Sequence, residues 1–195
     1  MKNFNLSQYA IKNLNACSCF MICIILVLAQ MTQFYLHELP CPLCLLQRIG
    51  FIGIAFGFLL NAYEKPRRFY YFISIVSALF TLSVGLRQVL LHIIPNTGVY
   101  GSAIFGLHLY TWSVLIASAV ILWITLLLLT NNSQFNDLPQ KKPTLSFKIL
   151  FFLLMAITLT NILTTFAICG FSVCPSDPNH YLWQSNQQAI SVTVK

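Results

Sequence analysis

The strongest constraint on the fold of this chain is the grouping of its apolar residues into five long blocks. The blocks cover roughly residues 16–36, 44–63, 69–91, 108–130 and 146–168. Each has about the 20 residues that an α-helix needs to cross a bilayer core. Backbone N–H and C=O groups find no partners in lipid, and the blocks show no alternation of apolar and polar residues, so barrel strands are excluded. We therefore predict an all-α integral membrane protein, a bundle of five transmembrane helices.

Charged residues are few, and they are unevenly placed between these blocks. Only 8% of the 195 residues are charged, against about 25% in soluble domains, and the net charge is +7. The cations near the first block, the second connection and the fourth connection are Lys2, Lys12, Lys65, Arg67, Arg68, Lys141, Lys142 and Lys148. The opposite connections contain no lysine. The positive-inside rule thus predicts a cytoplasmic N-terminus and explains the charge without a nucleic-acid partner.

This topology predicts one transmembrane domain over residues 1–168, followed by a C-terminal tail over residues 169–195 on the outer side. The first block has a polar start like that of a signal peptide, but it is too long and has no small-residue cleavage site before Pro40. We expect it to remain as the first span.

The seven cysteines separate into two groups on this topology. Three lie in the inner half of the first block, where a cysteine usually serves as a small apolar residue: Cys17, Cys19 and Cys23. Four lie at or beyond the outer membrane face: Cys41, Cys44, Cys169 and Cys174. In a bacterial cell that side is oxidising, and disulfides persist there. The four outer cysteines are therefore candidates for redox chemistry.

The first outer pair lies where the second helix is expected to begin. Pro42 suits the first helical position, which makes Cys41 the N-cap and places Cys44 in the first turn. Free N–H groups and the helix dipole at that end favour an anion, and the thiolate is the reactive form of cysteine. Arg48 shares a helix face with Cys44 and adds a positive charge, unless it only snorkels to the membrane surface. The pattern points to a reactive Cys44 beside an arginine.

Other uses of this pair are less favoured. Covalent haem requires a histidine directly after the second cysteine, and Leu45 stands there. A zinc site would combine two ligands at a helix start with two on a tail, without a repeated spacing, and we expect no metal. A disulfide across so short a loop adds little stability. Redox chemistry is the remaining use.

Three segments resemble the disulfide-bond-formation protein B (DsbB) family. They are LPCPLCLLQR (39–48), LRQVLLHIIP (86–95) and GVYGSAIFGLHLYTW (98–112), and the resemblance covers roughly residues 15–130. It implies a four-helix core and a quinone-dependent thiol oxidase of the bacterial inner membrane. Such an enzyme takes electrons from a periplasmic DsbA-like thioredoxin-fold protein and passes them to membrane quinone, either ubiquinone or menaquinone.

The resemblance also implies roles for individual residues. Cys41 and Cys44 would form the quinone-linked pair, with Cys44 facing the quinone. Arg48 would stabilise the Cys44 thiolate and the oxygen of the reduced quinone. His92, at the outer end of the third span, is a candidate neighbour of the quinone ring or a structural residue.

The chain departs from the familiar members in its second cysteine pair. Those members have four spans and carry that pair in the loop between the third and fourth spans, but residues 92–107 contain no cysteine here. The fifth span returns the chain to the outer side, where Cys169 and Cys174 emerge. We therefore expect this tail pair to replace the missing loop pair.

Several alternatives remain open at this stage. The chain could be a reductase similar to vitamin K epoxide reductase, or a non-enzymatic assembly factor that binds metal through its outer cysteines. His37 and Glu38 are candidates for proton transfer or simply polar residues at the membrane interface. Tyr181 and Trp183 suggest a tail that lies on the membrane surface.

Overall fold

A computed structural model describes residues 8–36, 38–64, 66–93, 103–130, 145–171, 174 and 181. Its five helices are α1 (Gln8–Tyr35), α2 (Pro42–Tyr63), α3 (Arg68–Leu91), α4 (Leu109–Thr130) and α5 (Leu145–Cys169). Two short strands, β1 (Ala103–Ile104) and β2 (Leu107–His108), precede α4. All five helices are long and apolar enough to cross a membrane, which confirms the predicted all-α membrane fold. The first helix begins at Gln8, earlier than the apolar block alone indicates.

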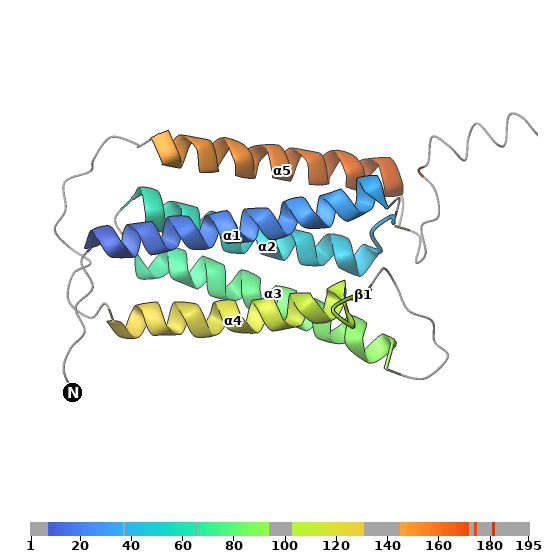
Figure 1. The fold of residues 1–195 in the computed structure, drawn as a ribbon, viewed down its shortest axis with the longest axis horizontal. Helices are drawn as coiled ribbons and strands as arrows, with labels where there is room; N and C mark the ends of the chain where they lie inside the picture. Colours follow the sequence, from blue (N-terminus) through green and yellow to red (C-terminus); the bar gives the residue numbers. More distant parts are fainter. Residues whose placement is uncertain are drawn as a thin grey trace, which may run out of the picture.

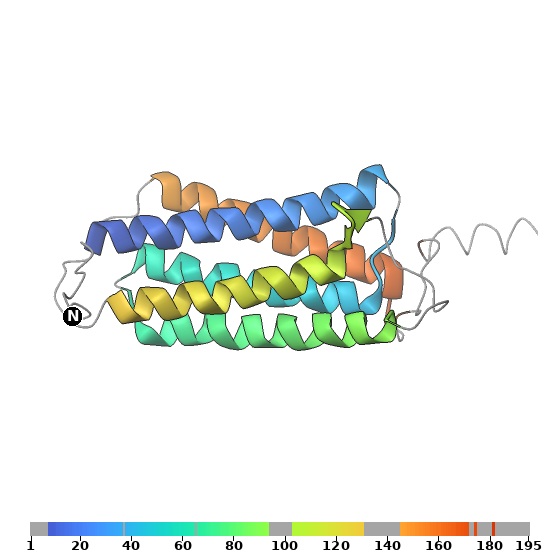
Figure 2. The same ribbon diagram turned by 60° about the horizontal axis from the view of Figure 1, so that its bottom comes forward.

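The helices lie side by side along one long axis (Figure 1). The helix α2 packs against α1, α3 and α5, and α4 joins the bundle through α3. Figure 2, turned by 60°, shows the same parallel arrangement of axes. Because α2 has the most neighbours, the residues at its start are surrounded by other elements of the fold.

Small residues bring α2 and α3 close together. A Cβ atom on Gly57 would lie 2.7 Å from the backbone oxygen of Tyr70, so only glycine fits there. Gly53 faces the side chain of Ser77 one turn earlier. Ser74 donates a hydrogen bond across the interface to the backbone oxygen of Ile54, 3.1 Å away. Close backbone approach through small residues is typical of packing between membrane helices.

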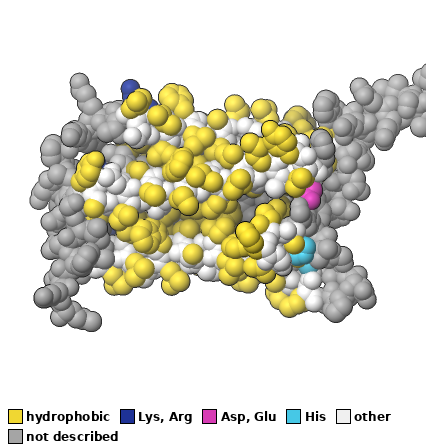
Figure 3. Space-filling view, in the orientation of Figure 1, with side chains coloured by type: hydrophobic (Ala, Val, Ile, Leu, Met, Phe, Trp, Pro, Cys, Tyr) yellow, Lys and Arg dark blue, Asp and Glu magenta, His cyan; other side chains and the backbone are white. Residues whose placement is uncertain are grey.

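The outer surface of the bundle is largely apolar. Figure 3 shows hydrophobic side chains over most of the length of the described helices. Leucine, isoleucine and phenylalanine side chains remain exposed on every helix, for example Phe20, Leu79 and Leu122. A soluble protein rarely exposes such a continuous apolar surface, whereas a membrane-spanning bundle presents it to lipid.

One end of the bundle, which we call the site end, brings together five parts of the chain. They are the end of α1, the start of α2, the end of α3, the β1–β2 hairpin with the start of α4, and the end of α5 (Figure 1). The opposite end carries Lys12, Arg67 and Lys148. The N-terminal residues before Gln8, His37, the linker over residues 131–144, Trp183 and most of the tail lie outside the described residues.

Candidate functional site

Cys41 caps the start of α2. Its backbone is extended (φ −67°, ψ 162°), Pro42 occupies the first turn, and the Cys41 Sγ atom accepts a hydrogen bond from the Cys44 backbone N–H at 3.2 Å. This confirms the helix start expected from the sequence. Both residues are free thiols, with Cys41 buried and Cys44 half-buried. The hydrogen bond with Cys44, together with burial, raises the pKa of Cys41, so Cys41 is the thiol of this pair that stays protonated.

A glutamine on α3 contacts both sulfur atoms. The Nε2 atom of Gln88 lies 3.3 Å from Cys41 Sγ and 3.5 Å from Cys44 Sγ. Its Oε1 atom accepts a hydrogen bond from Gln47 Nε2 at 2.7 Å. Gln88 is 1% exposed and Gln47 is also buried. Two buried amides, one on α2 and one on α3, thus form a polar wall behind the cysteine pair.

Arg48 is buried between helices rather than extended along the surface. It is 8% exposed, and its Nη2 atom donates to the Ala29 backbone oxygen at 2.6 Å. Its Nη1 atom donates to Gln33 Oε1 at 2.7 Å. The Nε2 atom of Gln33 in turn donates to the Tyr181 hydroxyl at 3.2 Å. The guanidinium is therefore held against α1 by two hydrogen bonds, one of which leads to the C-terminal tail.

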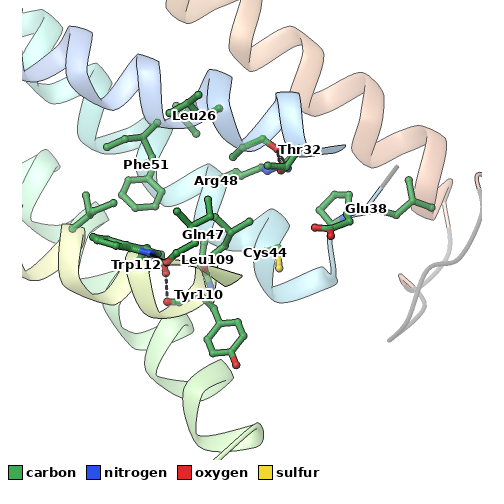
Figure 4. Close-up of a pocket in the computed structure, with 18 of the residues that line it drawn as sticks. Leu26, Thr32, Glu38, Cys44, Gln47, Arg48, Phe51, Leu109, Tyr110 and Trp112 are labelled. Atoms are coloured by element: carbon green, nitrogen blue, oxygen red, sulfur yellow. Dashed lines mark hydrogen bonds between the residues drawn. The ribbon is translucent and has the colours of Figure 1, made fainter. Parts of the chain in front are cut away.

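A cavity of about 280 Å³ opens beside Cys44 and Arg48. It lies between α1, α2 and α4, and its apolar lining includes Leu26, Leu28, Phe51, Leu109, Trp112 and Ile116. Figure 4 shows Arg48 and Cys44 at one side of this cavity, with Glu38 nearby and the side chains of α4 across from them. An apolar cavity with a few polar groups at one end is typical of a site for a small molecule.

The β1–β2 hairpin forms part of the mouth of this cavity. Ile104 and Phe105 belong to the lining, and Trp112 Nε1 donates a hydrogen bond to the Ile104 backbone oxygen at 3.1 Å. Phe105 and Gly106 form the two-residue turn with φ of 52° and 79°. Asparagine or glycine normally occupies such a turn, because a bulky side chain is strained at positive φ. The Phe105 side chain is 93% exposed. A strained backbone at a bulky residue of the cavity mouth makes this turn a functional candidate.

The two tail cysteines are joined to each other. Cys169, the last residue of α5, forms a disulfide with Cys174, and their Cα atoms are 4.5 Å apart. This disulfide lies in a cluster of apolar residues at the site end: Leu39, Leu45, Ile168, Cys169, Cys174 and Tyr181. Leu39 and Leu45 flank the Cys41–Cys44 segment in sequence. The cluster therefore brings both cysteine pairs to the same end of the bundle.

The remaining cysteine and histidine candidates lie apart from the cavity. Cys19 and Cys23 are buried in the central core of the bundle, and Cys17 is exposed on α1. His92 is not part of the cavity lining; its ring stacks on Tyr110, a lining residue, with 5.5 Å between ring centroids.

Three glutamines of the site were not singled out from the sequence: Gln33, Gln47 and Gln88. Each is an amide within an otherwise apolar span, and such residues usually face other helices. A glutamine within an apolar span was therefore the available signal in the sequence. It does not indicate which residues each amide contacts.

A comparison of the chain with family models finds one that covers the start of this site. Residues 12–100 match the model of the disulfide bond formation protein DsbB. Over these residues the chain is similar to the DsbB family. The matched part contains Cys41, Cys44, Arg48 and Gln88, whereas α5 and its disulfide lie beyond the DsbB match.

The curated relatives are bacterial proteins that carry the DsbB name. "Disulfide bond formation protein B" from Xanthomonas oryzae pv. oryzae strain MAFF 311018 is 35% identical over 77 residues, which cover 37% of this chain and 45% of the relative. The protein of the same name from Xanthomonas euvesicatoria pv. vesicatoria strain 85-10 matches with the same identity and coverage. The chain thus spans less than half the length of these DsbB relatives. No solved structure matches it.

Proposed function

We propose that this protein oxidises a periplasmic DsbA-like dithiol and transfers the electrons to membrane quinone. The observation that carries the proposal is the apolar cluster that holds the Cys169–Cys174 disulfide against Leu39 and Leu45, on either side of the Cys41–Cys44 segment. The similarity of residues 12–100 to the DsbB family supports the same chemistry. A thiol–disulfide relay requires two cysteine pairs that can reach each other.

The proposed relay moves two electrons and two protons from the partner dithiol to the Cys41–Cys44 pair. A partner thiolate attacks the Cys169–Cys174 disulfide, the partner leaves as a disulfide, and Cys169 and Cys174 become thiols. A thiolate of this pair then attacks an oxidised Cys41–Cys44 disulfide, which re-forms Cys169–Cys174 and leaves Cys41 and Cys44 reduced. In the structure Cys41 and Cys44 are free thiols, and Cys169 and Cys174 are joined in a disulfide.

Burial favours an order for the outer exchange. Cys169 is buried at the end of α5, whereas Cys174 is only half-buried. A thiolate from another protein reaches the more accessible sulfur faster. We therefore place the attack of the partner at Cys174 and the exchange with the inner pair at Cys169.

The cavity beside Cys44 fits a quinone. Its volume is about 280 Å³, and its apolar lining contains few charged groups, Arg48 among them. A bound quinone supplies an acceptor for two electrons and two protons. Arg48 would bind a quinone oxygen, since two of its five N–H donors are used by Gln33 and Ala29. Cys44 supplies the reacting sulfur, and the apolar walls exclude water from it.

We also propose an orientation in the inner membrane. The cations at the end of the bundle opposite the site end favour the cytoplasm by the positive-inside rule. The site end and the tail over residues 169–195 are then periplasmic. A reporter fused after Lys195 is expected to read as periplasmic, and a cytoplasmic reading would contradict this orientation.

The central experiment measures thiol-dependent quinone reduction by the purified protein. A reduced thioredoxin-fold oxidase and a short-chain quinone should yield partner disulfide and quinol. Cys44→Ala should abolish the reaction, whereas Cys17→Ala should leave it unchanged. Absence of quinol formation by the unmodified protein would contradict the proposal. Stoichiometric metal in that inactive protein would instead favour the metal-binding assembly factor.

The order of exchange is tested by trapping. The partner is used with its second cysteine replaced by alanine and its remaining cysteine activated as a disulfide with thionitrobenzoate. In Cys169→Ala the Cys174 thiolate displaces thionitrobenzoate, and no neighbouring thiol is left to break the new bond, so a mixed disulfide with the partner should accumulate. In Cys174→Ala that adduct should be absent. The reverse result would place the attack of the partner at Cys169.

A further inference from the structure

We propose that Gln88 is a catalytic residue that donates hydrogen bonds to the sulfurs of both Cys41 and Cys44 and so sets the reactivity of the pair. The proposal rests on the proposed thiol chemistry of this pair and adds a residue to it. Gln88 comes from α3, 44 positions beyond Cys44 in sequence, so only the packing of α3 on α2 brings it to the thiols.

The contacts of the Gln88 amide are specific at both ends. Its Nε2 atom lies 3.3 Å from one sulfur and 3.5 Å from the other, within the range of hydrogen bonds to sulfur. Its Oε1 atom accepts from Gln47 Nε2 at 2.7 Å. Because Gln47 occupies the oxygen, the NH₂ group of Gln88 is the end that faces the cysteines. Gln47 is thus a positioning residue for Gln88.

This arrangement suits a sulfur that changes its charge during the reaction. An NH₂ donor stabilises a thiolate, and hydrogen bonds to charged groups are stronger than those between neutral groups. The Gln88 oxygen lies 3.9 Å from Cys44 Sγ and can accept from the protonated thiol. One amide therefore serves both protonation states of Cys44. Since Gln88 and Cys41 are both buried, water does not supply an equivalent donor to the Cys41 sulfur.

The contact has consequences that do not require a quinone or a partner protein. A donor that favours the thiolate increases the fraction of Cys44 that reacts with an electrophile at neutral pH. It also favours the reduced form of the pair over the disulfide, which makes the pair a stronger oxidant. Both properties can be measured on the protein alone.

The test uses the purified full chain with Gln88→Glu and Gln88→Leu. Gln88→Glu keeps the shape of the side chain and an acceptor for Gln47, but it places acceptor oxygens at the sulfurs instead of an NH₂ donor. Gln88→Leu removes both functions. Alkylation of Cys44 in the reduced protein by iodoacetamide is followed by peptide mass spectrometry between about pH 6 and about pH 9, a range that includes the ordinary thiol pKa of about 8.5. The equilibrium constant of the Cys41–Cys44 disulfide is measured against glutathione.

We expect both variants to lower the alkylation rate at pH 7 by about tenfold and to move its pH profile upward. The disulfide should become about tenfold harder to reduce, which corresponds to ~30 mV for a two-electron couple. Gln30→Leu is the matched control, because Gln30 is a glutamine of α1 that donates to the Ile157 backbone oxygen, away from the cysteines. It should change neither property.

A packing role alone would give a different result. Loss of packing loosens the site, so alkylation would stay unchanged or become faster, and the disulfide equilibrium would not move. That result in Gln88→Glu, with helical content retained, would overturn the proposal. Failure of the proposed function can be told apart from failure of this proposal. If the protein does not reduce quinone but both Gln88 variants still lower the alkylation rate of Cys44, the role of Gln88 is supported and the proposed function is not.

Discussion

The guanidinium of Arg48 donates a hydrogen bond from Nη1 to Oε1 of Gln33, 2.7 Å away. This contact ties the buried cation at the cavity to α1, and the Nε2 atom of the same amide donates to Tyr181 of the tail. Gln33 thus links the tail, which carries Cys174 of the outer disulfide, to the charge beside Cys44. The orientation of Arg48 depends on a residue 15 positions earlier in the chain.

In the proposed reaction, removal of this link should weaken the binding of quinone. Gln33→Leu leaves one N–H group of Arg48 without its acceptor, so the guanidinium loses its fixed orientation. Since a hydrogen bond to a charged group is worth about 1.5–3 kcal/mol, we expect KM for a short-chain quinone to rise about tenfold. Steady-state kinetics measure this, with Gln30→Leu as control. An unchanged KM would show that Ala29 alone positions Arg48.

In the proposed reaction, the Tyr181 hydroxyl should affect the transfer of electrons from the partner more than the quinone step. Tyr181→Phe removes the acceptor for Gln33 but keeps the ring in the apolar cluster. A neutral hydrogen bond contributes about 0.5–1.5 kcal/mol, so we expect turnover with the protein partner to fall about three- to tenfold. Turnover with dithiothreitol, which can reduce Cys41–Cys44 directly, should change less. Tyr9→Phe, at the opposite end of the bundle, is the control.

The strained turn at Phe105 predicts opposite effects on stability and activity. Asparagine tolerates positive φ, and relief of this strain is worth about 1 kcal/mol. Phe105→Asn should therefore raise the thermal unfolding midpoint, while KM for quinone should increase because an apolar wall of the cavity mouth is lost. Phe171→Asn is the control, because Phe171 is exposed outside the cavity lining. If Phe105→Asn raises the midpoint but leaves KM unchanged, the Phe105 side chain does not contribute to the binding of quinone.

The contact between α2 and α3 should be sensitive to a single methyl group at one glycine. Gly57→Ala places a Cβ atom 2.7 Å from the Tyr70 backbone oxygen. The backbone must shift, and overpacking of this kind costs about 1–3 kcal/mol. Gly53→Ala meets the side chain of Ser77, which can rotate, so the loss should be smaller. Thermal unfolding followed by circular dichroism compares the two; equal losses would contradict the backbone clash.

Local chemistry was enough to predict the start of α2. Pro42 favours the first helical turn and Cys41 can accept a hydrogen bond from a free N–H group, whatever the rest of the chain does. The structure confirms that cap, with Cys44 in the first turn. The five spans were likewise predictable, because the cost of exposing backbone groups to lipid depends on length and composition alone.

The partners of the site residues could not be derived in this way. The spans are apolar on nearly all sides, so periodicity does not indicate which face of α1 or α3 points inward. Gln33 and Gln88 could each have faced any neighbouring helix. Their contacts with Arg48 and the cysteines follow from helix rotation, which the packing of small residues such as Gly57 determines.

The sequence by itself determined a membrane protein of five helices and a cysteine pair at a helix start, because both depend on short stretches of chain. Only the tertiary structure decided that Gln88 lies against the two thiols and that the Cys169–Cys174 disulfide shares a cluster with Leu39 and Leu45. The physical reason is that these contacts join residues of different helices. Their formation depends on how closely the helices approach and how each is rotated, which are properties of the packed bundle and not of any one segment.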